Sequence, residues 1–348
     1  MTQTFPWNWG WTNKLETIFD EHRPAGLVPG RIIFRGGDRW FAMAASGECE
    51  VIRGSRAGGD AVVGDWVALD QQPERTGIVA ILPRSSELTR RGTGRRVGRQ
   101  TLASNVDVIL LASALDGGRS LSRRRLERML ALAWESGARP VIVLTKSDLA
   151  ENHEDALTIV AQAAPGTEML VTSAHTGEGI EALRAIVAAA PTAALIGLSG
   201  CGKSSLVNAL LGYAKQTTGD VREDDLRGRH VTTSRELMPL PDGGLIMDTP
   251  GLREFAGGDS ESIDAVFSEM AELASSCRFN DCTHRHEPGC AIQAALASGE
   301  LDQDRYAHWL ELRDELENDD PRKRLERKKR EKEISKAVRR YFNEHHEK

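Results

Sequence analysis

Glycine, lysine and serine gather in one short stretch whose spacing suits the binding of a phosphate chain. Residues 197–205 read G-L-S-G-C-G-K-S-S, so the pattern G-x-x-x-x-G-K-S is complete. The apolar run 193–196 precedes it and the largely apolar run 206–211 follows. A strand, a glycine turn and a helix in this order aim backbone N–H groups and a helix N-terminus at an anion. The alternative, a chance glycine turn before a helix, does not account for both flanks.

The residue types in this loop predict separate contacts with a nucleotide. Lys203 is expected to reach the β- and γ-phosphates and to act in catalysis, and the Ser204 hydroxyl to ligate Mg²⁺. The expected phosphate-binding residues are Gly197, Leu198, Ser199, Gly200, Cys201, Gly202, Lys203, Ser204 and Ser205.

Four further short segments complete a guanine-nucleotide site. Thr145, Lys146, Ser147 and Asp148 follow an expected strand at 140–144, and Ser173 and Ala174 follow one at 169–171. Thr232 and Thr233 lie in a polar connection, and Asp248-Thr249-Pro250-Gly251 ends another apolar run. Each segment alone is weak, but the set is a strong signal. Alternating strands and helices from 100 to 256 predict a parallel sheet with helices on both faces and a ligand at its carboxyl edge.

The chemistry of these segments favours GTP over ATP. The Asp148 carboxylate can accept hydrogen bonds from guanine N1–H and the 2-amino group, whereas adenine N1 offers only a lone pair. Thr145 stands where asparagine is commoner, which predicts weaker guanine affinity with selectivity retained. Mg²⁺ is expected on Ser204 and on Thr232 or Thr233, between which the sequence does not choose, with Asp248 acting through water.

Catalysis needs a group that orients the attacking water. The residue after Gly251 is Leu252, which has no polar group for this role. His230 is the nearest candidate, because an imidazole can position the water or accept its proton. The alternative is that His230 only shapes its loop.

Composition and charge bound the class of protein. The 348 residues are 40% apolar and 28% charged, which predicts several domains. No run of about 18 apolar residues exists, and the N-terminus lacks the pattern of a signal peptide, so we expect a cytoplasmic protein without a membrane span. Residues 84–99 hold six arginines and one glutamate, and residues 321–348 hold twelve Lys/Arg and five Glu. On a chain of net charge −6 these patches indicate a polyanionic partner, or else two solvated faces.

The chain divides into four expected parts. Residues 1–98 comprise a loosely structured or helical lead-in and an OB-type β-barrel, since four or five short strands lie between 26 and 82. Residues 99–257 form the α/β domain. Residues 258–320 form a helical metal module, with helices at 260–274, 291–298 and 303–318, and residues 321–348 form a basic helix or tail.

A cysteine and histidine cluster lies in the third part. Cys277, Cys282 and Cys290 are spaced with His284 or His286 as a set of four ligands. Three thiolates and an imidazole suit a tetrahedral, structural Zn²⁺. The alternatives are unligated cysteines or a disulfide, which a reducing compartment disfavours.

The order of the nucleotide motifs is unusual. The base-reading segments, residues 145–148 and 173–174, precede the phosphate loop in the sequence. The α/β domain is therefore a circularly permuted P-loop GTPase domain. The chain resembles the ribosome small-subunit-dependent GTPase A (RsgA) family over nearly its whole length. Val63-Gly64-Asp65, Asn105-Val106-Asp107, the permuted motifs and the cysteine cluster carry the resemblance. Its C-x-H-x-x-E-P-x-C signature points to His284 as the fourth ligand.

The resemblance implies a monomeric GTPase that binds GTP and GDP and acts in late maturation of the small ribosomal subunit. It implies that the subunit stimulates hydrolysis and that barrel, zinc module and tail contact rRNA. Two other classes stay open: an RNA-binding assembly scaffold in which GTP is a timing ligand, and a GTP-gated switch for a protein partner.

Overall fold

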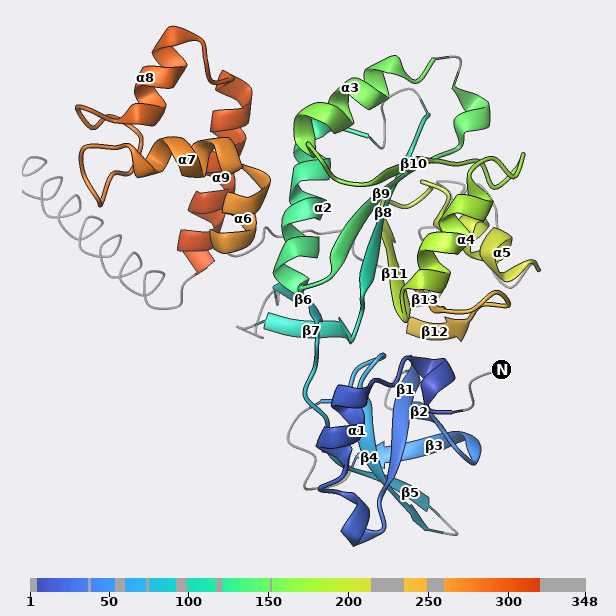
Figure 1. Ribbon diagram of the computed structural model, residues 1–348. Helices are drawn as coiled ribbons and strands as arrows, with labels where there is room; N and C mark the ends of the chain where they lie inside the picture. The colour runs from blue at the N-terminus through green and yellow to red at the C-terminus, as the bar shows by residue number, and fades with distance from the viewer. Residues whose placement is uncertain are drawn as a thin grey trace, which may run out of the picture. The chain divides into compact units, whose positions relative to one another are not determined.

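The structure is a computed structural model, and it describes most of the chain (Figure 1). The described residues are 5–36, 39–53, 60–72, 75–91, 99–116, 121–150, 152–213, 235–248 and 260–319. They fall into two compact units, a first unit of residues 1–255 and a second unit of residues 256–348.

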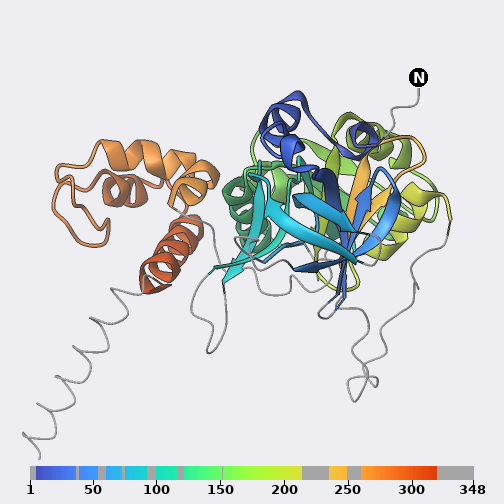
Figure 2. The same ribbon diagram turned by 90° about the horizontal axis from the view of Figure 1, so that it is seen from below.

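The first unit contains a closed five-stranded barrel. Its strands are β1 (Val28–Gly36), β2 (Arg39–Ala44), β3 (Gly47–Arg53), β4 (Trp66–Gln72) and β5 (Arg75–Ile81). They pair in the order β1-β2-β3-β5-β4, and β4 pairs again with β1 to close the barrel. Figure 2 views these strands from the barrel side of the unit. This closure confirms the expected OB-type barrel. The apolar residues that alternate along its strands fill one closed interior.

The N-terminal segment packs onto the barrel and is more ordered than the loose lead-in that the sequence suggested. Helix α1 (Asn13–Phe19) begins at Thr12, whose hydroxyl accepts a hydrogen bond from the Leu15 N–H. The Trp11 ring lies edge-on to Trp66, with 4.6 Å between centroids, and it also contacts Phe19. Aromatic burial explains why tryptophans stand among polar residues in this segment.

The rest of the first unit is an α/β sheet that continues from the barrel. Its strands are β8 (Val108–Ala114), β9 (Arg139–Thr145), β10 (Met169–Val171), β11 (Thr192–Gly197), β12 (Arg235–Pro239) and β13 (Leu245–Asp248). Its helices are α2 (Arg123–Ser136), α3 (Glu154–Ala163), α4 (Ile180–Ala189) and α5 (Lys203–Leu211). The order is β10-β9-β8-β11-β13-β12, with only β12 antiparallel to its neighbour.

Helices cover both faces of this sheet, as the apolar spacing predicted. Helices α2 and α3 lie on one face and α4 and α5 on the other (Figure 1). Leu110 of β8 and Leu195 of β11 pack in one buried cluster with Leu183 of α4 and Leu206 of α5. Because side chains alternate along a strand, neighbouring residues such as Ile109 are buried on the opposite face.

A buried arginine joins the barrel to the α/β sheet. Arg31 of β1 is 1% exposed, and its guanidinium donates to the Thr192 hydroxyl at 2.7 Å and to the Asn105 carbonyl at 3.2 Å. It also donates to the Trp9 carbonyl and lies over the Trp66 ring. Burial lowers the pKa of Arg31 to about 10, so the side chain stays charged at neutral pH. Strand β1 also pairs directly with β12, so the barrel strands and the α/β strands form one continuous sheet.

A second buried network surrounds Asp65, which is fully buried. Its carboxylate accepts hydrogen bonds from Arg84 at 2.7 and 2.8 Å, from the Ser104 hydroxyl at 2.6 Å and from the Val62 N–H at 2.8 Å. Arg84 was counted in the basic patch 84–99, but its charge is neutralised by this pairing. Strands β6 (Glu87–Arg91) and β7 (Arg99–Ser104) form an antiparallel pair within this arginine-rich stretch, which its composition alone did not predict.

Replacing Gly64 by alanine is expected to cost much more stability than the same change at Gly47. Both residues have a left-handed φ, +96° and +104°, so both variants carry the backbone strain of about 1–2 kcal/mol. A Cβ on Gly64 would lie 2.1 Å from the Ser104 carbonyl oxygen, whereas one on Gly47 meets nothing within 4 Å. Denaturant unfolding should show an additional loss of about 2 kcal/mol or more for Gly64→Ala. Equal losses would contradict the tight approach of these two segments.

In its described part, residues 260–319, the second unit is a bundle of four helices, α6 (Ser260–Val266), α7 (Ser268–Ser275), α8 (Ala291–Ser298) and α9 (Gln303–Asp319). The single helix expected at 260–274 is wrong, because the helix breaks at Phe267, whose side chain is fully buried. The unit has a hydrophobic core of its own. Its buried apolar side chains include Ile263, Phe267, Met270, Ile292, Trp309 and Leu312.

Candidate functional site

The phosphate loop joins the carboxyl end of β11 to the first turn of α5. Gly200 and Gly202 both have a left-handed φ, which turns the loop at these two residues. The Lys203 ammonium donates to the carbonyls of Gly197 at 2.9 Å and Leu198 at 2.6 Å, so it lies across the loop. Ser204 and Ser205 follow in the first helical turn. This local geometry is what an anion-binding loop needs.

The loop is held against the neighbouring strands by two close contacts. A Cβ on Gly197 would lie 2.4 Å from the Ala112 carbonyl oxygen of β8, so only glycine fits there. The hydroxyl of Thr145, at the end of β9, donates to the Cys201 carbonyl at 2.6 Å. Cys201 is buried, and burial raises the pKa of its thiol. The thiol therefore stays neutral, and the side chain packs as a small apolar group. Thr145 thus connects the base-reading segment to the phosphate loop.

Removing that hydroxyl is expected to weaken nucleotide binding. Thr145→Val keeps the shape of the side chain but leaves the buried Cys201 carbonyl without this donor, which costs about 1–3 kcal/mol. If half of this loss falls on the loop conformation that binds nucleotide, affinity should fall by about 2- to 10-fold. Titration with a fluorescent GDP analogue measures the effect, and Thr158→Val, an exposed threonine on α3, is the control. Unchanged affinity in Thr145→Val would show that the connection does not serve binding.

The base-reading turn is fixed by hydrogen bonds between two strand ends. Asp148 lies in the turn Ser147–Leu149 and accepts a hydrogen bond from the Ser173 hydroxyl. That bond lowers the pKa of Asp148, so its carboxylate stays ionised and acts only as an acceptor at neutral pH. Ser147 donates to Glu178 at 2.5 Å, and Ser173 N–H donates to the Glu178 carbonyl at 2.9 Å. The sequence reading missed Glu178, whose only local signal is its place beside two glycines.

The remaining nucleotide-site residues are placed unevenly by the structure. Lys146 precedes the turn in a left-handed conformation, and Ala174 follows Ser173 in the loop after β10. Asp248 ends β13, in register with Leu195 of the neighbouring β11. It therefore lies at the same sheet edge as Gly197. His230, Thr232, Thr233, Gly251 and Leu252 lie outside the described residues.

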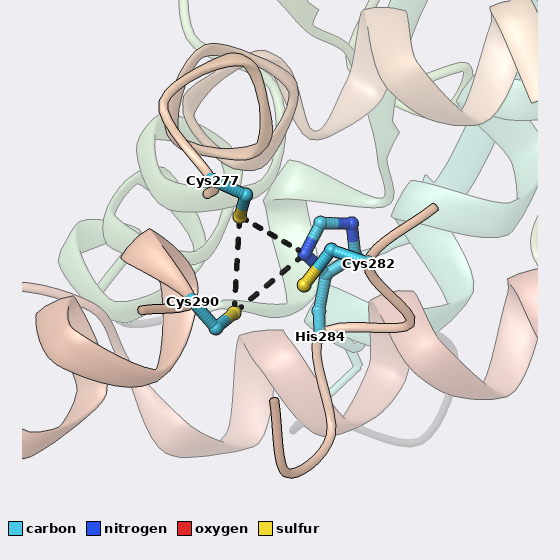
Figure 3. Close-up of side chains that lie close together, drawn as sticks. All are labelled: Cys277, Cys282, His284 and Cys290. Atoms are coloured by element: carbon cyan, nitrogen blue, oxygen red, sulfur yellow. Dashed lines mark hydrogen bonds between the residues drawn. The ribbon is translucent and has the colours of Figure 1, made fainter. Parts of the chain in front are cut away.

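The second unit brings the predicted metal ligands together. The ligand atoms of Cys277, Cys282, His284 and Cys290 all lie within 4.8 Å of one another (Figure 3). His284 Nδ1 is 3.5 Å from Cys277 Sγ and 3.7 Å from Cys290 Sγ, and those two sulfurs are 3.9 Å apart. His286 is exposed and lies outside this cluster, so the structure selects His284.

The separations among Cys277, His284 and Cys290 are close to those of a tetrahedral zinc site. Bond lengths of about 2.3 Å to sulfur and 2.0–2.1 Å to nitrogen give ligand-to-ligand distances of about 3.5–3.8 Å. Three thiolates and one imidazole would fill all four positions, which suits a structural ion. The cluster can hold one metal ion, and the donor set favours Zn²⁺.

Neighbouring side chains position the ligand loop. The Glu287 carboxylate accepts hydrogen bonds from the N–H groups of Thr283, Arg285 and His286, at 3.0, 3.0 and 3.1 Å. It also accepts one from the Thr283 hydroxyl, and this bond, with help from the backbone N–H groups of His286 and Thr283, lowers the pKa of Glu287 to about 2. The His284 carbonyl accepts from the Tyr306 hydroxyl at 2.8 Å. The loop is therefore tied both to itself and to α9.

The fold and the nucleotide motifs together define a class of protein. A phosphate loop on the middle strand of a parallel sheet, with a base-reading turn that precedes it in sequence, is a circularly permuted P-loop GTPase domain. The chain belongs to the RsgA GTPase family, whose model matches residues 81–257. Two relatives named "Small ribosomal subunit biogenesis GTPase RsgA" are each 40% identical to it. The protein from Streptomyces coelicolor aligns over 88% of this chain and 85% of its own length, and that from Methanosarcina acetivorans over 88% and 84%.

Two solved structures share the fold. YjeQ from Thermotoga maritima has a TM-score of 0.62 and 24% identity, and the match covers 83% of this chain and 98% of YjeQ. YloQ, described as a circularly permuted GTPase, has a TM-score of 0.58 and 24% identity over 85% of this chain and 96% of its own. Among the described residues, none of the helices combines the length and apolar composition needed to cross a bilayer.

Proposed function

We propose that the chain hydrolyses GTP to GDP and phosphate, that it binds the small ribosomal subunit, and that it acts in the subunit's late maturation. One observation supports the GTPase part of the proposal. Lys203, Thr145 and Asp148 lie at one edge of the sheet, and the Thr145 hydroxyl bonds to the phosphate loop. The names of the relatives support the ribosomal part.

In this proposal each side chain has one task. Lys203 contacts the β- and γ-phosphates, and the loop N–H groups of residues 197–205 surround them. Asp148 pairs with the guanine edge, with Ser173, Ala174 and the Lys146 stem beside the base. Mg²⁺ binds the phosphates and Ser204, with Thr232 or Thr233 completing the shell and Asp248 acting through water. Zn²⁺ on the Cys/His cluster supports the second unit and does not enter the reaction.

Hydrolysis in this proposal depends on the subunit. Because Leu252 follows Gly251, the DxxG turn supplies no glutamine to orient water. We assign that task to His230, positioned when the protein meets the subunit. The chain acts as a monomer in the cytoplasm, and the zinc module, barrel and basic residues 321–348 contact rRNA.

The test is GTP hydrolysis with and without purified small subunits. Turnover is expected to rise at least tenfold with subunits, and His230→Ala should lose this stimulation while it keeps GTP binding. His22→Ala, which changes a histidine of the N-terminal segment outside the proposed nucleotide site, is the matched control. Subunit binding without stimulation would favour the scaffold function, in which GTP is a timing ligand. Neither binding nor stimulation would favour a switch for a protein partner.

A further inference from the structure

A polar pocket lies beside the metal ligands in the second unit, and the nucleotide site does not use it. Its volume is about 390 Å³, within the range of small-ligand pockets, which begins near about 300 Å³. Its lining includes Asp264 of α6, Phe279 and Asn280 after α7, and Trp309 and Arg313 of α9. Three of the four metal ligands form one wall. A directly coordinated ion needs far less space than this, so most of the volume is left for another occupant.

Two side chains of the pocket wall have hydrogen-bond donors without an acceptor among the residues that the structure describes. Trp309 is 1% exposed, and its indole N–H has no acceptor in the part of the chain that the structure describes. Buried polar groups are nearly always bonded, and Trp309 lines the pocket, so its N–H calls for an acceptor from outside these residues. The Arg313 guanidinium lies 4.7 Å from the Trp309 ring centroid. Within the described residues it forms no hydrogen bond or ion pair.

An acceptor and an aromatic ring complete the pocket. Asp264 is half-buried, and burial raises the pKa of its carboxyl while the nearby Arg313 charge opposes this change. Phe279 lines the pocket and is 41% exposed; the Arg278 guanidinium lies over its ring, 5.4 Å from the centroid, and the rest of the ring is available for stacking. Donors, a carboxylate and an exposed aromatic ring together are the groups that proteins use to hold an unstacked nucleobase.

We propose that this pocket, here called the Trp309 pocket, binds an unpaired guanine of RNA. Guanine O6 and N7 accept hydrogen bonds, which suits Arg313 and the Trp309 N–H, and its N1–H and 2-amino group donate to a carboxylate such as Asp264. Adenine would place the N1 lone pair against that carboxylate. The identification of the RNA as rRNA rests on the proposed function, but the recognition of guanine does not.

The test uses the full-length, zinc-loaded protein saturated with GDP, so that the nucleotide site of the first unit is filled. Binding of fluorescein-labelled UUUGUU and UUUAUU hexanucleotides is followed by anisotropy. We expect the guanine oligonucleotide to bind about 10- to 100-fold more tightly. Arg313→Ala and Asp264→Asn should each remove most of this preference. Arg285→Ala loses the same charge at an exposed ion pair with Asp314 and should retain it. Zinc content of every variant shows whether the module is still folded.

Equal binding of the two oligonucleotides, or a preference that survives both pocket variants, overturns the proposal. So does a result in which these variants weaken subunit binding but not guanine preference, which would assign the pocket to a protein. Subunit-stimulated hydrolysis is measured in parallel. Its absence beside an intact guanine preference would refute the proposed function alone, and the reverse result would refute the pocket alone.

Discussion

Asp148→Asn is expected to exchange the base that the protein binds, from guanine to xanthine. Xanthine keeps N1–H but has a carbonyl where guanine has the 2-amino group. The asparagine amide can accept a hydrogen bond from xanthine N1–H and donate one to the xanthine carbonyl. With guanine, its N–H group would face the 2-amino group, and two donors cannot bond to each other. The Ser173 hydroxyl can still donate to the remaining side-chain oxygen, so the turn should keep its geometry.

The expected size is large because the discrimination depends on paired polar groups. Sites built to hydrogen-bond a substrate group reject analogues by about 10⁴–10⁵, so the ratio of GTP to XTP affinity should change by about that factor. Competition of GTP and XTP against a fluorescent GDP analogue measures the ratio. Asp155→Asn, an exposed change of the same type at the start of α3, is the control. A variant that still prefers GTP would mean that Asp148 does not read the base.

Removal of zinc is expected to unfold the ligand loop and destabilise the second unit without disturbing nucleotide binding. The ligands connect the end of α7 through Cys277 with the start of α8 through Cys290, and the His284 ring packs 5.4 Å from Trp309 of α9. Binding free energies of structural zinc are about 10–16 kcal/mol, and much of this supports folding. The core of the second unit should keep part of its helices compact, so the loss should be greatest in residues 276–290.

Limited proteolysis with and without a chelator tests this expectation. Cleavage within 276–290 should become rapid, and Cys282→Ser should behave like the chelated protein. Cys49→Ser changes a thiol in the barrel and should leave the pattern unchanged. GDP affinity should stay within about twofold throughout, since the nucleotide site belongs to the first unit. Unaltered protection of residues 260–319 after zinc loss would show that the metal is not structural.

The local elements of both sites could be predicted from the sequence because their signals are short in range. Glycine spacing from 197 to 202 places the turn, and the apolar runs on both sides place β11 and α5. Helix α8 has the bounds expected from its apolar spacing and the glycine after it. The prediction of one helix at 260–274 was wrong because the helix breaks where Phe267 enters the core. The position of that core depends on α9, which is distant in the sequence, so no local pattern indicates the break.

The sequence by itself determined which groups could do chemistry: a lysine and serine after a glycine turn, an aspartate that accepts from guanine, and three cysteines with a histidine. These follow from residue type and spacing over a few positions. Only the tertiary structure decided that Thr145 bonds to Cys201, that Arg84 is neutralised by Asp65 and that Arg31 joins the barrel to the sheet. It also decided that Trp309 lines a pocket with Asp264 and Arg313. The reason is physical: partners of buried polar groups come from distant parts of the chain, and packing of the whole fold sets which of them meet.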